Sequence, residues 1–399
     1  MPDLITAAPW VLVAGGFHKH GGMDRANLAL AEYLSAKNCR VELVAHSVDE
    51  CLQQRPGITS HVVPRPAGSV LLGERQLDAA GRKVIRQVEA RAGRAHVVAN
   101  GGNCIWPGAN WVHYVHHAWS DARPGAPLHA RLKGSIFSTV GRIREQWALS
   151  AAQVVVANSR KTLRDLTELA GVGQEKLEVI YLGADPTWGR ITTREREAAR
   201  QHFDLAPDRP VAAFVGALSR DRKKGFDTLF AAWRDLCSNP AWNADLLVAG
   251  AGADLEYWRS SIRRAGLEAR VRLLGFTFNI PQVLAAADLL ISPSRYDSYG
   301  LNVQEALCRG LPALVSTRAG VSERFDDALS DLLLPDPDDR AMLARRLIAW
   351  QRDPEDWRRR CELLGARLRA HTWDDMAAQL ADVVANGLMR RSLAARGAQ

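Results

Sequence analysis

The sequence predicts an α/β protein made of two doubly wound domains, each built around a parallel sheet. Short apolar segments ending in glycine or a polar residue alternate with segments whose apolar residues recur at helical spacing. This alternation runs through residues 11–183 and starts again at residue 210. A chain of 399 residues also has about the length of two domains.

The first half opens with a strand, a glycine-containing loop, a helix and a second strand. VLVAGG at 11–16 is typical of a buried strand, and Leu28, Ala31 and Leu34 share one face of a helix at 26–37. This order is the start of a doubly wound sheet. The further strands expected in this half are 41–46, 95–100, 111–116, 152–159 and 177–183.

The second half repeats the pattern after a junction within 184–200, which contains Pro186, Gly189 and a charged run. We therefore expect domains at 1–188 and 189–372, with a helix at 373–399 that returns to the first domain. The expected strands are 210–217, 245–250, 271–276, 288–294 and 312–317, and the expected helices are 225–237, 254–266, 280–287 and 300–309, followed by two C-terminal helical stretches.

Composition excludes several classes of protein. With 47% hydrophobic and 24% charged residues, the chain is neither disordered nor collagen-like. No apolar run reaches the length of about 18 residues that spans a bilayer. The first residues lack a basic region and include Asp3, which predicts a cytoplasmic protein without a signal peptide. Six scattered cysteines without CxxC spacing predict buried free thiols rather than disulfides or a zinc site.

Positive charge is concentrated in residues 51–150, which hold 13 Lys and Arg against 5 Asp and Glu. This excess suits an anionic membrane surface or a phosphorylated substrate, and the alternative is a solvated surface. Nucleic acid is disfavoured, because no binding motif accompanies the charge. Residues 134–149 predict an amphipathic helix that either docks on a membrane or faces the core. Its apolar residues are Ile136, Phe137, Val140, Ile143 and Trp147, and its basic residues are Arg142 and Arg144.

The segment 291–323 carries the strongest chemical signal. A strand ends at Ser294, and Asp297 lies in the loop that leads to a helix beginning at Gly300. The backbone N–H groups of that helix start, at Leu301 and Asn302, predict an anion site. Glu305 lies one turn further on and is placed to bind a neutral polyol.

Two further segments provide candidate residues for a ligand. Gly21 and Gly22 follow the first strand and let a ligand approach the backbone. A dinucleotide site is the rival interpretation of this loop, but the G-x-G-x-x-G spacing is missing. Residues 250–252 are interpreted as a turn. The run RDRKK at 220–224 offers Lys224, with Arg220 or Arg222, for phosphate.

Three histidines lie in WVHYVHHAW at 111–119. Strand alternation would put His113 and His117 on one side and His116 on the other. Zinc binding is the competing interpretation, but no acidic or cysteine ligands accompany these histidines in the sequence.

The segment from Asp297 to Glu305, followed by GLP, resembles the E-x7-E block of retaining glycosyltransferases of family 4, which have the GT-B fold. Four other motifs resemble the same family in the same order over about 300 residues. They are VLVAGGFHKHGGMDRANLALAEYL, VVVANSRKTLRDL with VIYLGAD, VGALSRDRKKGFDTLFAAW, and VRLLGF with AAADLLISPS. The resemblance implies two Rossmann-like domains that face each other across a cleft.

The resemblance also assigns roles to residues. It implies that Glu305 holds the donor ribose and that Asp297, where the family usually has Glu, contacts the transferred sugar. Lys224 would face the diphosphate. The family's arginine position is Ala217 here, so Arg220, or next Arg222, would replace it. The cleft histidine matches His116 best and His117 next. Gly21, Gly22, Ser294, Gly300, Leu301 and Asn302 complete the expected donor site.

The implied activity is retaining, metal-independent transfer of a hexose from a UDP- or GDP-linked donor, with no cofactor and no nucleic acid partner. A glycan, a lipid-linked molecule or a small molecule is the acceptor, and cell-surface polysaccharide or glycoconjugate synthesis is the expected setting. Two alternatives are a catalytically silent nucleotide-sugar-binding subunit and a nucleotide-sugar epimerase or hydrolase.

Overall fold

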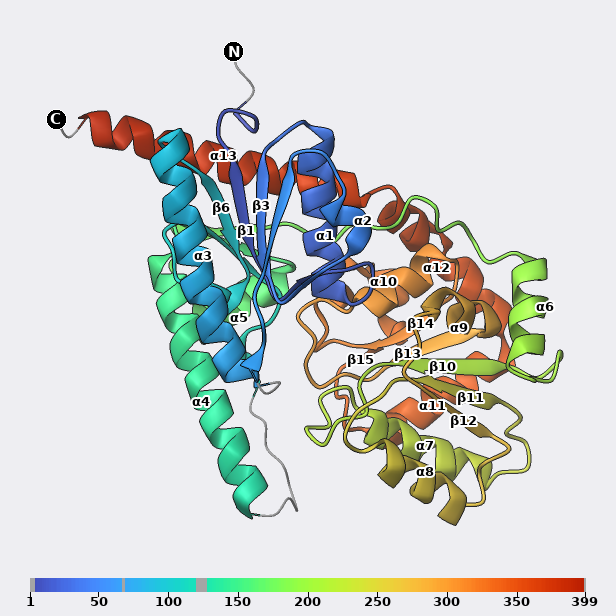
Figure 1. Cartoon of the computed structure of the whole chain (residues 1–399). Helices are drawn as coiled ribbons and strands as arrows, with labels where there is room; N and C mark the ends of the chain where they lie inside the picture. The colour runs from blue at the N-terminus through green and yellow to red at the C-terminus, as the bar shows by residue number, and fades with distance from the viewer. Residues whose placement is uncertain (1–3, 67–68, 120–127, 398–399) are drawn as a thin grey trace. The chain divides into compact units, whose positions relative to one another are not determined.

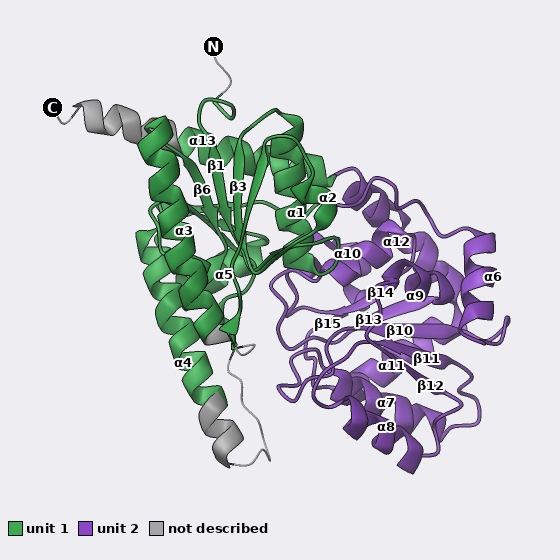
Figure 2. Cartoon of the chain, in the orientation of Figure 1, with its two compact units in different colours: residues 1–183, 372–399 green, residues 184–371 purple. Residues whose placement is uncertain are grey.

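The structure is a computed structural model that describes residues 4–66, 69–119 and 128–397 (Figure 1). It divides into two compact units (Figure 2). Unit 1 comprises residues 1–183 and 372–399, and unit 2 comprises residues 184–371. The first boundary thus lies between Gly183 and Ala184. The C-terminal helix α13 (Trp373–Gly397) is part of unit 1, where it packs against α1 (Gly22–Ala36).

Unit 1 contains a parallel seven-stranded sheet in the order β5-β3-β1-β6-β7-β8-β9, and β2 and β4 form a separate parallel pair. Its strands are β1 (Trp10–Val13), β2 (Gly16–Phe17), β3 (Val41–Ala45), β4 (Ser47–Val48), β5 (Ile58–Val62), β6 (His96–Ala99), β7 (Ala109–Val112), β8 (Val154–Ala157) and β9 (Leu177–Val179). Its further helices are α2 (Glu50–Gln53), α3 (Val70–Ala92), α4 (Leu128–Ala151) and α5 (Arg160–Glu168), with short 3-10 helices η2 (Gly101–Asn103), η3 (His116–Ala118) and η4 (Gln174–Lys176).

Helices α3, α4 and α5 cover the same face of this sheet. Residues paired in register on parallel strands point to the same face. The register pairs Val11 with Val97, Ala99 with Asn110 and Val112 with Ala157. Residues of this row pack against α3 in one apolar cluster and against α4 and α5 in another. The outer sides of α3 and α4 therefore belong to one surface of unit 1.

Unit 2 is built on a parallel six-stranded sheet in the order β12-β11-β10-β13-β14-β15. Its strands are β10 (Val211–Val215), β11 (Asp245–Ala249), β12 (Val271–Gly275), β13 (Leu289–Ser292), β14 (Ala313–Ser316) and β15 (Leu333–Leu334). Its helices are α6 (Thr193–His202), α7 (Phe226–Cys237), α8 (Leu255–Arg264), α9 (Ile280–Ala286), α10 (Leu301–Cys308), α11 (Arg340–Arg352) and α12 (Pro354–Arg369), with 3-10 helices η5 (Gly320–Arg324) and η6 (Asp327–Leu332). The predicted fold class, two parallel α/β units, is confirmed.

Two predicted strands end four residues before the expected position. The strand predicted at 111–116 ends at Val112, because the chain then leaves the sheet and forms the 3-10 helix η3. The strand predicted at 177–183 ends at Val179. The edge strand β5 and the long helix α3 that follows it were not predicted. The residues of β5 are only partly buried and show no clear alternation.

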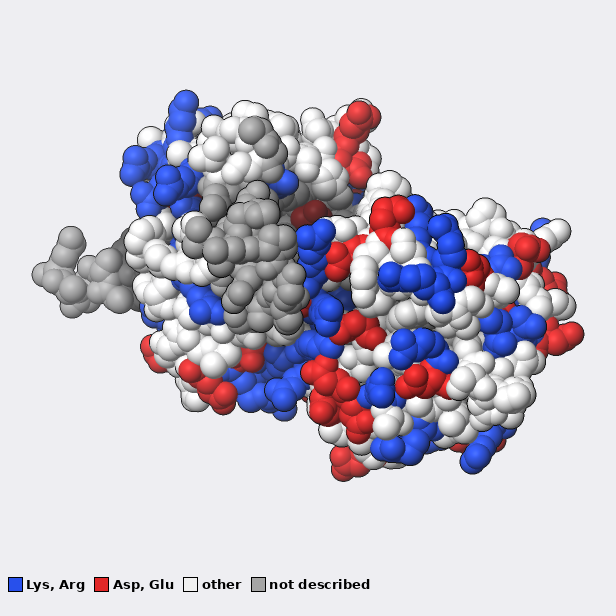
Figure 3. Space-filling view, turned by 90° about the horizontal axis from the view of Figure 1, so that it is seen from below, with Lys and Arg blue, Asp and Glu red and all other residues white. Residues whose placement is uncertain are grey.

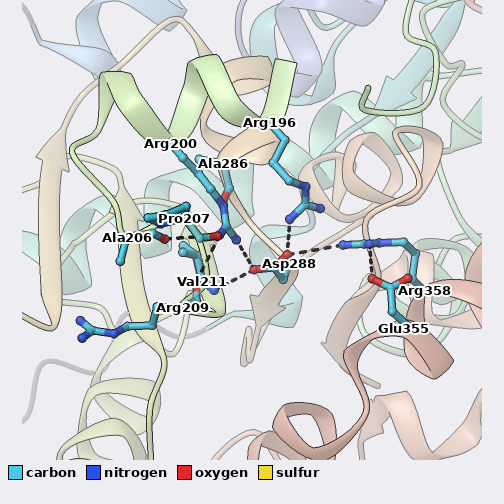
Figure 4. A network of polar contacts seen from close by, with 10 residues as sticks. All are labelled: Arg196, Arg200, Ala206, Pro207, Arg209, Val211, Ala286, Asp288, Glu355 and Arg358. Carbon is cyan, nitrogen blue, oxygen red and sulfur yellow. Dashed lines mark hydrogen bonds and ion pairs between the residues drawn. The ribbon is translucent and has the colours of Figure 1, made fainter. Parts of the chain in front are cut away.

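A buried carboxylate joins four segments at the start of β13 (Figure 4). Asp288 is only 8% exposed. It accepts hydrogen bonds from Arg196, from Arg200 at 2.5 Å and from the backbone N–H of Val211 at 2.9 Å, and it lies 3.4 Å from Arg358. Helices α6 and α12 are thereby tied to the adjacent central strands β10 and β13.

The six cysteines are all free thiols, as predicted, although they differ in exposure. Four are buried, Cys237 is intermediate and Cys51 is exposed. Burial raises the pKa of Cys104, Cys308 and Cys361 to about 12, so these three thiols are protonated at neutral pH. None of the helices in the described part of the chain combines the length and the hydropathy of a membrane-spanning segment.

Removing the Asp288 carboxylate should destabilise unit 2 strongly. Asp288→Ala leaves Arg200, itself 7% exposed, without its anionic partner, and such a loss costs about 3–5 kcal/mol. Urea unfolding measures this change. The matched control is Asp326→Ala, which removes a half-exposed pair with Arg367 and should cost less than about 1 kcal/mol. Equal losses in the two variants would contradict the structural role of Asp288.

Unit 1 should lose stability in mild acid through His96. Burial lowers the pKa of His96 from 6.5 to about 4, so its ring takes up a proton at a lower pH in the folded chain than in the unfolded chain. The contribution of the neutral His96 ring to the free energy of unfolding is therefore complete above pH 6.5 and is lost as the pH falls toward 4. One proton corresponds to a slope of about 1.4 kcal/mol per pH unit. Urea unfolding between pH 7 and 4.5 should show a flatter profile for His96→Asn; an unchanged slope would contradict the assignment.

Candidate active site

The carboxyl ends of β10 and β13 bring two predicted segments together in unit 2. These strands are neighbours at the centre of the sheet, and loops 216–225 and 293–300 follow them. Gly225 has a φ of +71°, and a Cβ there would lie 1.9 Å from the carbonyl oxygen of Pro293. Only glycine permits so close an approach of the two loops.

Lys224 and Asp297 meet as a direct result of this approach. The Lys224 Nζ atom lies 2.5 Å from Asp297 Oδ2, although the residues are 73 positions apart. The two side chains are 25% and 14% exposed. An ammonium group at this edge of a parallel sheet is placed where such sheets bind their ligands.

The helix α10 begins beside this ion pair. Gly300 has a φ of +99° and occupies the N-cap position, where no side chain caps the helix. The N–H groups of Val303 and Gln304 donate to the Gly300 carbonyl at 3.0 and 3.3 Å. The N–H groups of Leu301 and Asn302 precede these first bonds and lie at the positive end of the helix dipole. Asn302 donates from Nδ2 to the carbonyl of Val215 at 2.9 Å, which fixes the start of α10 against the end of β10.

Glu305 and Ser294 lie on the same segment. Glu305 follows one turn into α10 and is partly buried. Ser294 is buried directly after β13, with its Oγ atom 3.4 Å from that of Ser292. The segment 294–305 thus places a hydroxyl, two carboxylates and a helix N-terminus within twelve consecutive residues.

Arg220 points elsewhere. Its Nε atom donates to Asp254 at 3.0 Å, just before α8, and its side chain is 54% exposed. Arg222 has a φ of +52° and lies 3.7 Å from Asp227. The structure therefore joins Lys224 to Asp297 but pairs neither predicted arginine with this carboxylate.

Arg295, which no sequence motif marks, fastens the two loops to each other. Its guanidinium donates to both carboxylate oxygens of Asp227, at 2.7 and 2.9 Å, and to the carbonyl of Arg222 at 2.6 Å. Asp338 accepts from its Nε atom at 2.8 Å, and the Arg295 backbone N–H donates to the carbonyl of Lys223 at 2.8 Å. The group is half-buried, and burial opposes its charge while Asp227 and Asp338 raise its pKa.

The turn expected at 250–252 also has a packing role. A Cβ at Gly250 would lie 1.8 Å from the carbonyl oxygen of Gly216, and one at Gly252 would lie 2.3 Å from that of Leu218. The loop after β11 therefore supports the loop that carries Lys224.

The predicted glycine loop of unit 1 leads into α1. Gly21 has a φ of +85° and is the N-cap of α1, and Gly22 is its first residue. His18 lies within this loop and contacts the Ser47 hydroxyl at 2.7 Å. Burial raises the pKa of Asp24, in the first turn of α1.

The histidine segment differs from the strand alternation that we expected, because His116 and His117 lie in η3. Glu145 of α4, a buried carboxylate that was not predicted to lie here, accepts from the N–H of His116 at 2.8 Å and contacts His117 Nδ1 at 2.7 Å. A Cβ at Gly141 would lie 2.8 Å from His116 Nδ1, so glycine makes room for this ring. Burial lowers the pKa of His113 to about 3, which keeps its ring neutral. Among the described residues, no group of three or more His, Cys, Asp or Glu side chains is arranged to hold a metal ion.

Solved structures share the fold of the whole chain. Sucrose-phosphate synthase from Thermosynechococcus elongatus matches with a TM-score of 0.74 and 20% identity, over 97% of this chain and 100% of that chain. The Anabaena protein HepE in complex with UDP-glucose matches with a TM-score of 0.68 and 20% identity, over 94% of this chain and 99% of that chain. The architecture is the GT-B fold.

Sequence comparison identifies the family. Residues 20–188 match glycosyltransferase family 4, and residues 195–363 match the glycosyl transferases group 1. The chain belongs to the group 1, family 4 glycosyltransferases. A D-inositol 3-phosphate glycosyltransferase from Nocardia farcinica is 33% identical over 200 residues, 48% of this chain. The matched part spans less than half the length of that relative, 44%.

Replacing Arg295 should loosen the loop that carries Lys224. Arg295→Ala removes the bonds to Asp227, Asp338 and the Arg222 carbonyl, and we expect a loss of about 3 kcal/mol together with faster amide exchange in residues 219–226. Hydrogen-exchange mass spectrometry measures the local change. Arg295→Lys should restore only part of the protection, because an ammonium group cannot donate the two parallel hydrogen bonds that the guanidinium makes to Asp227.

The control for this experiment is Arg345→Ala, an exposed position on α11, which should leave exchange in residues 219–226 unchanged. Protection that is the same in Arg295→Ala and the native protein would show that other contacts hold the loop.

Proposed function

We propose that the protein transfers a hexose from a nucleoside diphosphate sugar to a hydroxyl acceptor with retention of configuration. The observation that carries the proposal is the Lys224–Asp297 pair beside the uncapped N-terminus of α10. A cation and free N–H donors suit a diphosphate, and a carboxylate suits sugar hydroxyls. Family membership supports the same reaction class.

The donor roles follow from position along one segment. Lys224 and the N–H groups of Leu301 and Asn302 would stabilise the charge that develops on the departing diphosphate. Asp297 would bind hydroxyls of the transferred sugar, and Glu305 those of the ribose. Ser294 and Gly300 would line the donor-binding site. Arg220 would have to break its bond with Asp254 to reach the diphosphate, so we propose that Lys224 provides most of the charge stabilisation.

Unit 1 residues complete the proposal. Gly21 and Gly22 would let the donor approach the backbone at the start of α1, and His116 would contact the transferred sugar. The buried Glu145 would position His116 through its backbone N–H. The acceptor oxygen would bond to the anomeric carbon on the face from which the diphosphate departs, while the bond from that carbon to the phosphate oxygen breaks. The leaving phosphate would take the acceptor proton. This direct displacement uses no carboxylate nucleophile, and we propose that it needs no metal.

UDP is the proposed donor nucleotide, and GDP is the alternative. The UDP-glucose complex of HepE, a protein of the same fold, supports UDP. The name of the Nocardia relative supports a small polyol or its phosphate as acceptor. A glycan or lipid-linked acceptor, in cell-surface polysaccharide synthesis, is the alternative.

Lys224→Ala and Glu305→Ala test the site. Loss of one donor to developing charge reduces kcat about 10²–10³-fold, so Lys224→Ala should lower kcat by that amount. Glu305→Ala should weaken nucleotide binding about 10–100-fold through the lost charged hydrogen bond. Calorimetry with UDP, GDP, ADP, TDP and NAD measures binding, and release of the nucleotide measures turnover.

The controls are Lys223→Ala and Glu268→Ala, a neighbouring lysine and an exposed glutamate, which should change neither quantity. Near-native turnover in Lys224→Ala would overturn the site. Binding of a nucleoside diphosphate without turnover would favour a silent relative. Donor consumption without any acceptor would favour an epimerase or hydrolase, and binding of NAD alone would favour a dinucleotide site.

A further inference from the structure

Helix α4 exposes apolar side chains on the side that faces away from the sheet. Its inner side packs through Ala148 and Leu149, which are buried. Ile136, Ile143 and Trp147 are 52%, 44% and 57% exposed. At 100° per residue these three residues point away from the sheet, where a solvated helix normally carries charge. We call them the apolar stripe.

The exposed positions of this part of α4 carry no charge at all. Besides the stripe and Phe137, the exposed residues from 134 to 151 are Ser135, Thr139, Gln146 and Ser150. The two arginines that we expected to supply the basic side of this helix instead donate hydrogen bonds to backbone carbonyls within unit 1. Arg142 donates to the carbonyl of His116 at 3.2 Å, and the buried Arg144 donates to that of Gly102 at 2.8 Å.

The neighbouring helix α3 supplies the positive charge instead. Its exposed residues Arg75, Lys83 and Arg86 point away from the sheet, because its inner side packs through Leu77, Val84 and Ile85. The three acidic residues of α3 are only partly exposed. Two of them are paired: Glu74 with Arg144 and Asp78 with Arg82. We call Arg75, Lys83 and Arg86 the basic stripe.

The two stripes belong to one surface. Helices α3 and α4 cover the same face of the sheet and lie side by side in Figure 1, and Arg144 of α4 contacts Glu74 of α3. In Figure 3, by contrast, acidic and basic side chains alternate over the part of unit 2 that is seen on the right. Among the described residues, the outer face of α3 and α4 combines cations with an exposed tryptophan and two exposed isoleucines, and it exposes no anion.

We propose that this face docks on the surface of an anionic lipid bilayer. Cations attract anionic headgroups over about a Debye length, while tryptophan and isoleucine enter the boundary between headgroups and acyl chains. A protein partner would have to be acidic along α3 and apolar along α4, whereas an anionic bilayer offers both properties everywhere. The docking does not depend on the proposed transfer reaction.

Vesicle sedimentation of the full chain tests the proposal. At low salt the protein should bind vesicles of 30% phosphatidylserine in phosphatidylcholine far more tightly than pure phosphatidylcholine, and about 1 M NaCl should release it, because the Debye length falls to about 3 Å. Equal binding to both vesicles, or none to the anionic ones, would overturn the proposal.

Two double variants assign the binding to the stripes. Lys83→Glu with Arg86→Glu should weaken binding about 25-fold or more, since each cation near the surface contributes about fivefold. Ile143→Ser with Trp147→Ser should weaken it about tenfold or more. Calorimetry with the nucleoside diphosphate should give unchanged affinity in both variants, which separates this test from that of the proposed function.

Matched controls come from unit 2. Leu363→Ser removes a side chain that is 78% exposed, and Arg263→Glu with Arg264→Glu reverses two exposed cations on α8. Both should bind vesicles like the native protein. Vesicle binding that falls equally in controls and stripe variants would overturn the assignment. Loss of a concentration-dependent dimer, rather than of vesicle binding, in the stripe variants would assign the face to a second copy of the chain.

Discussion

The buried carboxylate of Asp288 fixes the part of unit 2 on which the candidate site depends. It stands at the start of β13 and bonds to the first N–H of β10, so the two central strands are registered to each other at their amino ends. Two arginines of α6 and one of α12 converge on it. A buried carboxylate is tolerable only with such partners, which in turn hold the surrounding helices in place. The loops at the opposite ends of the same strands start from a rigid base.

From that base, the site is assembled by close backbone contact rather than by bulky packing. Gly225 meets the Pro293 carbonyl, and Gly250 meets the Gly216 carbonyl, so three loops approach each other where any side chain would keep them apart. Arg295 then locks two of these loops through charged hydrogen bonds. Lys224 and Asp297 therefore meet with little freedom, which is the condition for electrostatic stabilisation without reorganisation.

Much of the fold and of the candidate site could be predicted from the sequence. The residues that could not be predicted have contacts that are distant in the sequence. The strand and helix pattern of unit 2 and the candidate segment 294–305 follow from local periodicity and glycine positions. Arg295 and Glu145 could not be found in this way, because their partners lie tens of residues away and only the fold brings them close. For α4 the periodicity predicted a helix, but apolar residues on both sides concealed which side faces the sheet. The roles of Glu305, His116 and the glycine loop stay predictions.

The ion pair between Lys224 and Asp297 has a consequence for selectivity among anions. The lysine carries its own counter-ion, which is covalently part of the chain and always present. Any free anion has to displace a carboxylate held at 2.5 Å, so a singly charged ion such as chloride gains little by binding there. An anion that also reaches the N–H groups of α10 has a second set of bonds to make. The pair thereby favours extended, multiply charged groups over the small anions of the surrounding solution.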